Sequence, residues 1–201
     1  MATSRTKNSK RAFENSWEPT MGTNKTGLTF RRVAEKTARL KVRPGKGLNL
    51  TLSQVLQGLQ NKVCRKVAFT YGGQLCFHFG SMIPYDNQKL NGMLKGQWIL
   101  NTCGTAWSAQ TPDEWVTSDQ DQRDAESRLQ ALVGRKVTLA RICSRRLLVE
   151  FGMRFALYIS PSTEDEKSGL PYWELFTPHH RVYSYGPGMK KSYRASNVPA
   201  S

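Results

Sequence analysis

The residues that could carry acid–base chemistry are few and widely spaced. His78 lies within a run of alternating apolar residues, and the internal alignment described below places it opposite Glu150. A histidine beside a carboxylate is a possible acid–base couple, and Glu150 with Glu174 is a possible carboxylate pair. The alternative is that all three face solvent from the polar sides of strands. We favour this alternative, because no sequence spacing brings the three together.

Metal and cofactor chemistry finds no support in the motifs. His179 and His180 stand at an expected hairpin tip without further ligands at short spacing. The sequence contains no GxSxG, HExxH or strand-linked GxGxxG motif, and Pro44 to Gly47 lacks the spacing of a phosphate loop. The four cysteines form no CxxC pair, and in a reducing compartment they are small buried apolar residues: Cys64, Cys76, Cys103 and Cys143. We therefore expect no metal, no cofactor and no catalysis.

The formal charge of +15 and the pI of about 10 point to a polyanionic partner. Residues 1–50 hold twelve Lys and Arg against three Glu, a net charge of +9. Because residues 1–47 show no sustained apolar periodicity, we expect a disordered basic arm there, which contacts phosphates or only solubilises the chain. The phosphate contacts predicted in the arm are Arg5, Lys7, Lys10, Arg11, Arg31, Arg32, Arg39, Lys41 and Arg43.

A second basic and aromatic cluster lies near the C-terminus. Arg181, Tyr183 and Tyr185 share one face of the last expected strand, and Lys190 and Lys191 follow it. Such a face could stack unpaired bases while the basic residues neutralise phosphates. The alternative is that both tyrosines complete the core, with their hydroxyls at its rim.

Hydrophobic periodicity predicts the elements that would position these residues. A helix is expected from Thr51, with a capping box to Gln54 and an apolar stripe along one side. The period then changes to two, and two strands flank Gly72-Gly73 as a hairpin. A long loop over 81–96 and a strand over 97–101 follow, with Trp107 on a short returning strand.

The second half is expected to repeat this order. Thr111 to Glu114 has the pattern of a helix start, and a longer helix should run through Ala125 and Leu129 and stop at Gly134. Strands are predicted over 136–143 and 147–152, a polar loop over 161–171 and a hairpin over 172–185. A flexible basic tail is predicted over 188–201.

Three short motifs recur in the same order. Lys62-Val63, Phe79-Gly80 and Trp98-x-Leu100-x-Thr102 return as Lys136-Val137, Phe151-Gly152 and Trp173-x-Leu175-x-Thr177. We interpret them as an internal duplication, with repeats at 48–110 and 111–187 related by a pseudo-two-fold axis and with Trp98 equivalent to Trp173. The alternative is two similar meanders that share only generic patterning.

The predicted fold is therefore α+β and β-dominant, built from a duplicated helix-plus-antiparallel-meander unit. The predicted function is that of a non-enzymatic binding protein that contacts nucleic acid or a nucleoprotein through its arm and tail. Two alternatives remain: a protein-interaction module, such as an immunity or adaptor protein, that uses its β surface, and an enzyme with a cleft between the repeats. Because the sequence has neither a membrane-length apolar run nor the hydrophobic core of a secretion signal, we expect a cytoplasmic location.

Overall fold

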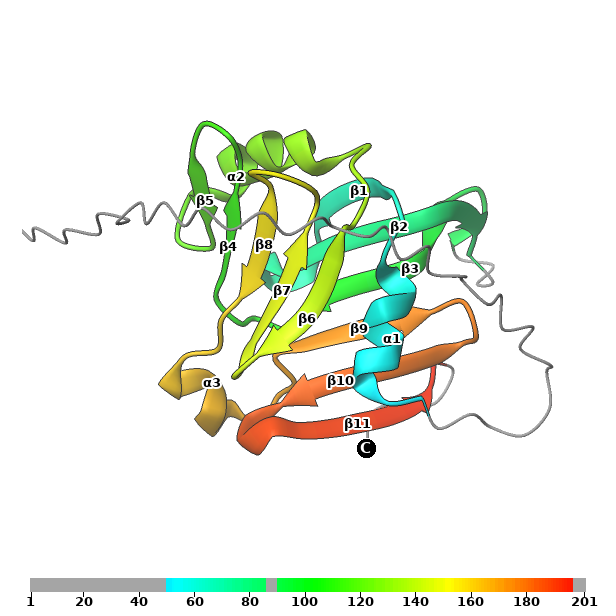
Figure 1. The fold of residues 1–201 in the computed structure, drawn as a ribbon, viewed down its shortest axis with the longest axis vertical. Coiled ribbons are helices and arrows are strands. Elements are labelled where there is room, and N and C mark those ends of the chain that lie inside the picture. Colours follow the sequence, from blue (N-terminus) through cyan, green and yellow to red (C-terminus); the bar gives the residue numbers. More distant parts are fainter. Residues whose placement is uncertain (1–49, 86–89, 197–201) are drawn as a thin grey trace, which may run out of the picture. The chain divides into compact units, whose positions relative to one another are not determined.

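Two antiparallel sheets share one apolar core in the computed structural model (Figure 1). The structure describes residues 50–85 and 90–196, which all belong to one compact unit, Gly47–Ser201. The fold is α+β with strands dominant, as the sequence predicted. The predicted arm, 1–47, lies outside the described residues.

The six-stranded sheet has the order β1-β2-β3-β9-β10-β11. Its strands are β1 (Cys64–Phe69), β2 (Leu75–Pro84), β3 (Leu94–Thr102), β9 (Trp173–Thr177), β10 (Arg181–Gly186) and β11 (Lys190–Ala195). The five-stranded sheet has the order β5-β4-β8-β7-β6. Its strands are β4 (Trp107–Gln110), β5 (Trp115–Thr117), β6 (Leu139–Cys143), β7 (Arg146–Glu150) and β8 (Ala156–Ile159).

Aromatic side chains join the two sheets across the core. Phe77 and Phe79 alternate with polar residues along β2, so both rings point to the same face of the sheet. The Phe151 ring lies just after β7, and its centroid is 6.4 Å from that of Phe77 and 6.1 Å from that of Phe79. The sheets therefore pack face to face through their period-two apolar residues.

Helix α1 (Leu52–Leu59) packs beside β6 and buries the predicted apolar stripe: Leu52, Val55, Leu56 and Leu59. The predicted capping box is confirmed, because the Thr51 hydroxyl accepts the Gln54 N–H and the Gln54 side chain accepts the Thr51 N–H. Gly58 lies directly under the Trp98 ring, where a Cβ atom would be 2.8 Å from the ring edge. The helix therefore depends on glycine at this position to approach the six-stranded sheet.

Helix α2 (Gln122–Leu129) begins at Asp121, whose carboxylate accepts two backbone N–H groups of the first turn. It buries Ala125 and Leu129, and it continues into the short 3-10 helix η3 (Gln130–Leu132). The predicted second helix is thus confirmed, with its last turn tightened. It packs against β1 and β5, one strand from each sheet.

Each sheet contains three strands that are consecutive in the chain and is extended by a hairpin from the other part of the chain. Strand β9 pairs with β3 around Leu100 and Leu175, so β9 and β10 extend the sheet of β1–β3. Strand β4 pairs with β8 around Ala109 and Leu157, so β4 and β5 extend the sheet of β6–β8. The arrangement β1-β2-β3-β9-β10 in one sheet therefore parallels β6-β7-β8-β4-β5 in the other, and β11 has no counterpart in the five-stranded sheet.

The internal duplication is not confirmed, and the predicted equivalence of Trp98 and Trp173 does not fit the strand order. Trp98 and Trp173 lie on β3 and β9, which are neighbours in the same sheet and run antiparallel. By strand order, Trp173 on β9 corresponds to Trp107 on β4, because each of these strands pairs with the third strand of the other half. The duplication itself stays a prediction.

Several local predictions were wrong. Thr111 and Glu114 form the turn between β4 and β5, because the Glu114 carbonyl accepts the Thr111 N–H and the chain reverses. The predicted loop over 81–96 begins and ends as strand, because β2 pairs with β3 from Met82–Gly96 to Pro84–Leu94. The polar loop over 161–171 contains helix α3 (Thr163–Ser168), which Ser162 and Asp165 cap reciprocally.

The tail predicted over 188–201 is also corrected over much of its length. A 3-10 turn, η4 (Pro187–Met189), follows β10 and reverses the chain. Strand β11 then pairs with β10 through six residue pairs, from Gly186–Lys190 to Arg181–Ala195. Residues 190–195 are therefore an edge strand.

Candidate nucleic-acid interface

The β10–β11 hairpin brings together the C-terminal residues predicted to contact nucleic acid. Tyr183 lies opposite Tyr193, and Tyr185 lies opposite Lys191. Because directly opposed residues of an antiparallel pair share one face, Lys191 and Tyr193 extend the row of tyrosines toward the sheet edge.

Tyr183 and Tyr185 do not present exposed rings for base stacking. Their exposed fractions are 6% and 2%, and both rings belong to the apolar core. The Tyr185 ring stacks on Trp173 at a centroid distance of 5.8 Å. Burial raises the pKa of both phenols, foremost through desolvation. The prediction that these two rings stack on bases is therefore corrected, and they complete the core instead.

The exposed aromatic ring of this hairpin is Tyr193, which the sequence interpretation missed. Tyr193 is 38% exposed, and its centroid is 4.8 Å from that of Tyr183. The guanidinium carbon of Arg181 lies 4.9 Å from the Tyr193 centroid, a cation–π distance. The sequence did contain one indication of strand β11, because Lys191 and Tyr193 alternate with Ser192 as residues on opposite faces of a strand do.

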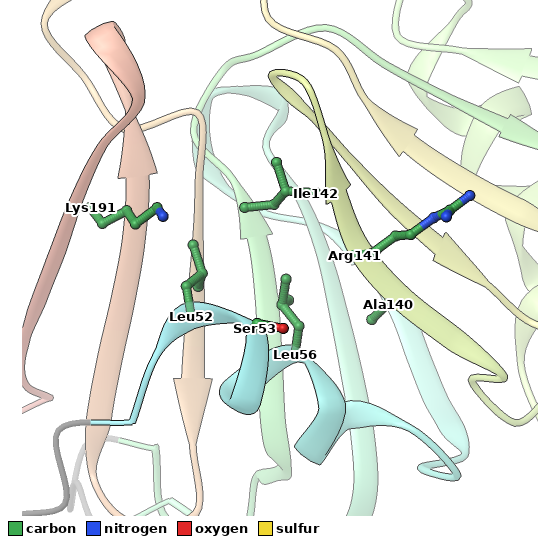
Figure 2. Close-up of a pocket in the computed structure, with 7 residues that line it drawn as sticks. All are labelled: Leu52, Ser53, Leu56, Ala140, Arg141, Ile142 and Lys191. Atoms are coloured by element: carbon green, nitrogen blue, oxygen red, sulfur yellow. The ribbon is translucent and has the colours of Figure 1, made fainter.

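Lys190 and Lys191 are exposed on the edge strand β11. Figure 2 shows the Lys191 side chain pointing toward Leu52 and Ile142, whereas Arg141 points away. Lys191 borders two adjoining hollows of about 190 and 300 Å³. The first hollow is lined by Leu52, Ser53, Leu56, Ala140, Arg141, Ile142 and Lys191. The second is lined by Leu50, Thr51, Leu52, Tyr183, Ser184, Lys191, Ser192 and Tyr193.

Glu174 is held by partners on the outer face of the six-stranded sheet. Its carboxylate accepts the Ser184 hydroxyl at 2.9 Å and the Arg194 guanidinium at 3.1 Å. The Arg194 and Glu174 side chains are 23% and 16% exposed, so this half-buried ion pair offsets part of the local positive charge. These contacts give Glu174 of β9 a structural role, because they connect it to β10 and to the basic strand β11.

His78 forms a buried contact with Cys76, two residues earlier on β2. The Gly96 N–H donates to His78 Nδ1 at 2.9 Å, which places the proton of the neutral imidazole on Nε2. Nε2 lies 3.3 Å from the Cys76 Sγ. Desolvation by burial, with a smaller contribution from the Lys66 charge, lowers the pKa of His78 to about 4. Desolvation raises the pKa of Cys76 to about 11.

Those protonation states oppose nucleophilic chemistry at this pair. A thiolate–imidazolium pair needs protons on both ring nitrogens, but Nδ1 already accepts the Gly96 N–H. At neutral pH the Cys76 thiol and the His78 imidazole are both uncharged. Their contact is therefore a structural contact within the buried part of the sheet.

The structure does not bring His78 and Glu150 together. His78 alternates with the core residues Phe77 and Phe79 on β2, whereas Glu150 follows the core residue Val149 on β7. Both side chains therefore point away from the shared core, on different sheets. Neither of the two hollows is lined by His78, Glu150 or Glu174. His179 and His180 are exposed between β9 and β10.

The nine predicted contact residues of the arm lie outside the described residues, so their phosphate contacts stay a prediction. Within residues 50–85 and 90–196, no three His, Cys, Asp or Glu side chains gather into a possible metal site. Over the same ranges, no helix combines the length and apolar character that crossing a bilayer requires.

Comparison with known proteins gives no further guide to the site. No protein-family model, no curated protein and no solved structure matched the chain significantly.

Proposed function

We propose that the protein is a non-enzymatic binding protein that contacts nucleic acid, alone or within a nucleoprotein. Its contacts are the basic segment 1–47 and the exposed cations of β11. The observation that carries this proposal is the edge of the six-stranded sheet, where Lys191 is exposed on the same face as the Arg181–Tyr193 contact and Lys190 is exposed on the opposite face. Cations beside an exposed aromatic ring suit a phosphate backbone and its bases.

The distribution of charge supports a polyanion at this edge. Acidic residues concentrate between Asp113 and Glu126 and in helix α3, whose Glu166 carboxylate accepts the Gly188 N–H at 2.9 Å beside the start of β11. The stretch 175–196 contains no Asp or Glu, and it carries the four cations of the hairpin: Arg181, Lys190, Lys191 and Arg194. The chain's excess of +15 further favours approach to a polyanion over long range. We also propose a cytoplasmic location, because Cys64, Cys76, Cys103 and Cys143 are free and a reducing compartment keeps thiols in that form.

The test is the salt dependence of oligonucleotide binding. The logarithm of the association constant should fall linearly with the logarithm of salt concentration, because bound Lys and Arg release counterions from the phosphates. Replacing Lys190 and Lys191 by Gln should reduce the slope by roughly 1.8 on duplex DNA, about 0.9 for each lost contact. Deleting 1–47 should reduce it further. Fluorescence anisotropy with a labelled oligonucleotide measures these slopes.

A matched control removes the same charge elsewhere. Arg123 and Lys167 are exposed on α2 and α3, among acidic residues, so replacing both by Gln should leave the slope nearly unchanged. Equal slopes for the two double variants would reject β11 as a contact. Binding that persists unchanged in high salt would reject the proposed function.

A further inference from the structure

The outer face of the five-stranded sheet carries a pair of aromatic rings, of which Trp115 is exposed and Tyr158 is partly buried. Val116 of β5 and Leu157 of β8 point into the core, so Trp115 and Tyr158, beside them in sequence, point outward. Trp115 is 50% exposed. Its ring centroid is 5.7 Å from that of Tyr158, with 37° between the planes. The pair thus bridges β5 and β8 across the intervening strand β4.

Arginines flank this aromatic pair on both sides. The strand registers place five residues of the outer face in one row across the sheet, in which Leu148 is only 8% exposed: Thr117, Ser108, Tyr158, Leu148 and Arg141. The row thus ends on β6 with an exposed arginine that points away from the α1 hollow in Figure 2. On the other side, the Arg154 guanidinium donates to the Pro112 carbonyl at 2.6 Å. This bond holds the Arg154 guanidinium near the turn that precedes Trp115.

We propose that this outer face binds single-stranded nucleic acid, with bases stacked on Trp115 and Tyr158 and phosphates near Arg141 and Arg154. The inference rests on the proposed function and deepens it by naming the form of nucleic acid bound. Exposed aromatic rings on an open antiparallel sheet accept the faces of unpaired bases, which a duplex keeps stacked inside itself.

Charge and neighbouring polarity favour this occupant. Arg141, Arg146 and Arg154 are exposed around the outward strands, and the acidic residue among the outward positions of β4 to β8 is Glu150. Asp113 and Glu114 lie in the turn before Trp115, where Glu114 is paired with Arg128 at 2.6 Å. The basic segment 1–47 carries the same sign of charge as this face, so like-charge repulsion disfavours it as the occupant. Ser108 and Gln110 between the rings supply groups that can hydrogen-bond to base edges.

Trp115 provides a direct fluorescence signal. Three other tryptophans of the described residues are buried: Trp98, Trp107 and Trp173. A Trp17→Phe background removes the one tryptophan that lies outside those residues. In this full-length background, titration with a single-stranded thymidine oligonucleotide should quench emission, because stacked bases quench indole. A duplex of equal length should quench it much less.

Affinity measurements on variants test the same contact. Trp115→Ala should weaken single-strand binding by about 5- to 150-fold, the range for loss of one base stack. Trp115→Phe should retain most of the affinity, and duplex binding should not change in either variant. The control is Leu170→Ala, which removes an exposed apolar side chain beyond α3 and should leave both affinities unchanged.

The outcomes separate this inference from the proposed function. Unchanged single-strand affinity in Trp115→Ala, with salt dependence retained at β11, overturns the inference and leaves the proposed function standing. If neither single strands nor duplexes bind, both fail. If deleting 1–47 by itself makes Trp115 more accessible to iodide, the segment occupies this face and the inference is overturned.

Discussion

The protonation of His78, whose imidazole accepts a buried hydrogen bond, makes the stability of the fold depend on pH. An unfolded histidine takes up a proton below a pH of about 6.5. In the folded protein burial lowers the pKa of His78 to about 4, so between these values only the unfolded state binds the proton. This contribution to stability is therefore complete above pH 6.5 and is lost as the pH falls from 6.5 toward 4.

Replacing His78 by Asn should flatten this pH dependence. The Asn Oδ1 can accept the Gly96 N–H in place of Nδ1, and the amide does not titrate in this range. Between pH 7 and pH 4.5, the wild-type protein should lose roughly 1–3 kcal/mol more unfolding free energy than the variant. Urea unfolding at several pH values measures this difference.

The control for this experiment is His179→Asn, because His179 is exposed at the turn after β9. It should retain the wild-type pH profile. If His78→Asn loses as much stability as the wild type over this range, protonation of His78 does not contribute.

At the scale of elements, the contact between α1 and β3 depends on one missing side chain. Gly58→Ala should gain about 1 kcal/mol in helix propensity. The new Cβ would lie 2.8 Å from the buried Trp98 ring, and such overpacking typically costs 1–3 kcal/mol, so the net change should be destabilising. Thermal unfolding against the exposed control Gln57→Ala measures the balance. A more stable Gly58→Ala protein would show that the ring moves aside freely.

Elements with strict periodicity were predictable from the sequence, whereas those defined by a neighbour were not. Helix α1 and the β1–β2 hairpin were predicted because their apolar spacing matches a single period. Strand β11 has the polar sequence Lys-Lys-Ser-Tyr-Arg-Ala, and its extended form is set by backbone pairing with β10. Two capping patterns show the same limit. Ser162 begins a helix, but Thr111 makes a hairpin turn, because partner strands lie on both sides of it.

For the whole molecule, the exchanged hairpins make each half necessary to the other. Fragment 48–110 would lack β9, β10 and β11 of the six-stranded sheet, and fragment 111–201 would lack β4, which lies between β5 and β8 in the five-stranded sheet. Each fragment would also lack part of the shared core. Expressed alone, neither should show dispersed amide resonances or near-ultraviolet circular dichroism. Mixing them should restore both signals. A fragment that folds by itself would support independent repeats.

The sequence predicted the chemical class of the partner, a polyanion, but it predicted only some of the residues that form the candidate interfaces. The charge of +15 and its concentration in the first 50 residues indicated a polyanion without any structure. The pairing of Trp115 with Tyr158 depends on the registers of β4 with both β5 and β8, which no short-range pattern specifies. The burial of Tyr183 and Tyr185 likewise follows from core packing, because alternation alone does not say which face of a strand is covered.

The exchange also affects how the chain is made. Leu100 on β3 can pair with Leu175 only after Leu175 has left the ribosome. Until then β3 is an unpaired edge strand. At 5–20 residues per second the delay is roughly 4 to 15 seconds, far longer than a hairpin needs to form. The nascent first half would therefore display apolar strand surface to the cell's chaperones on every round of translation.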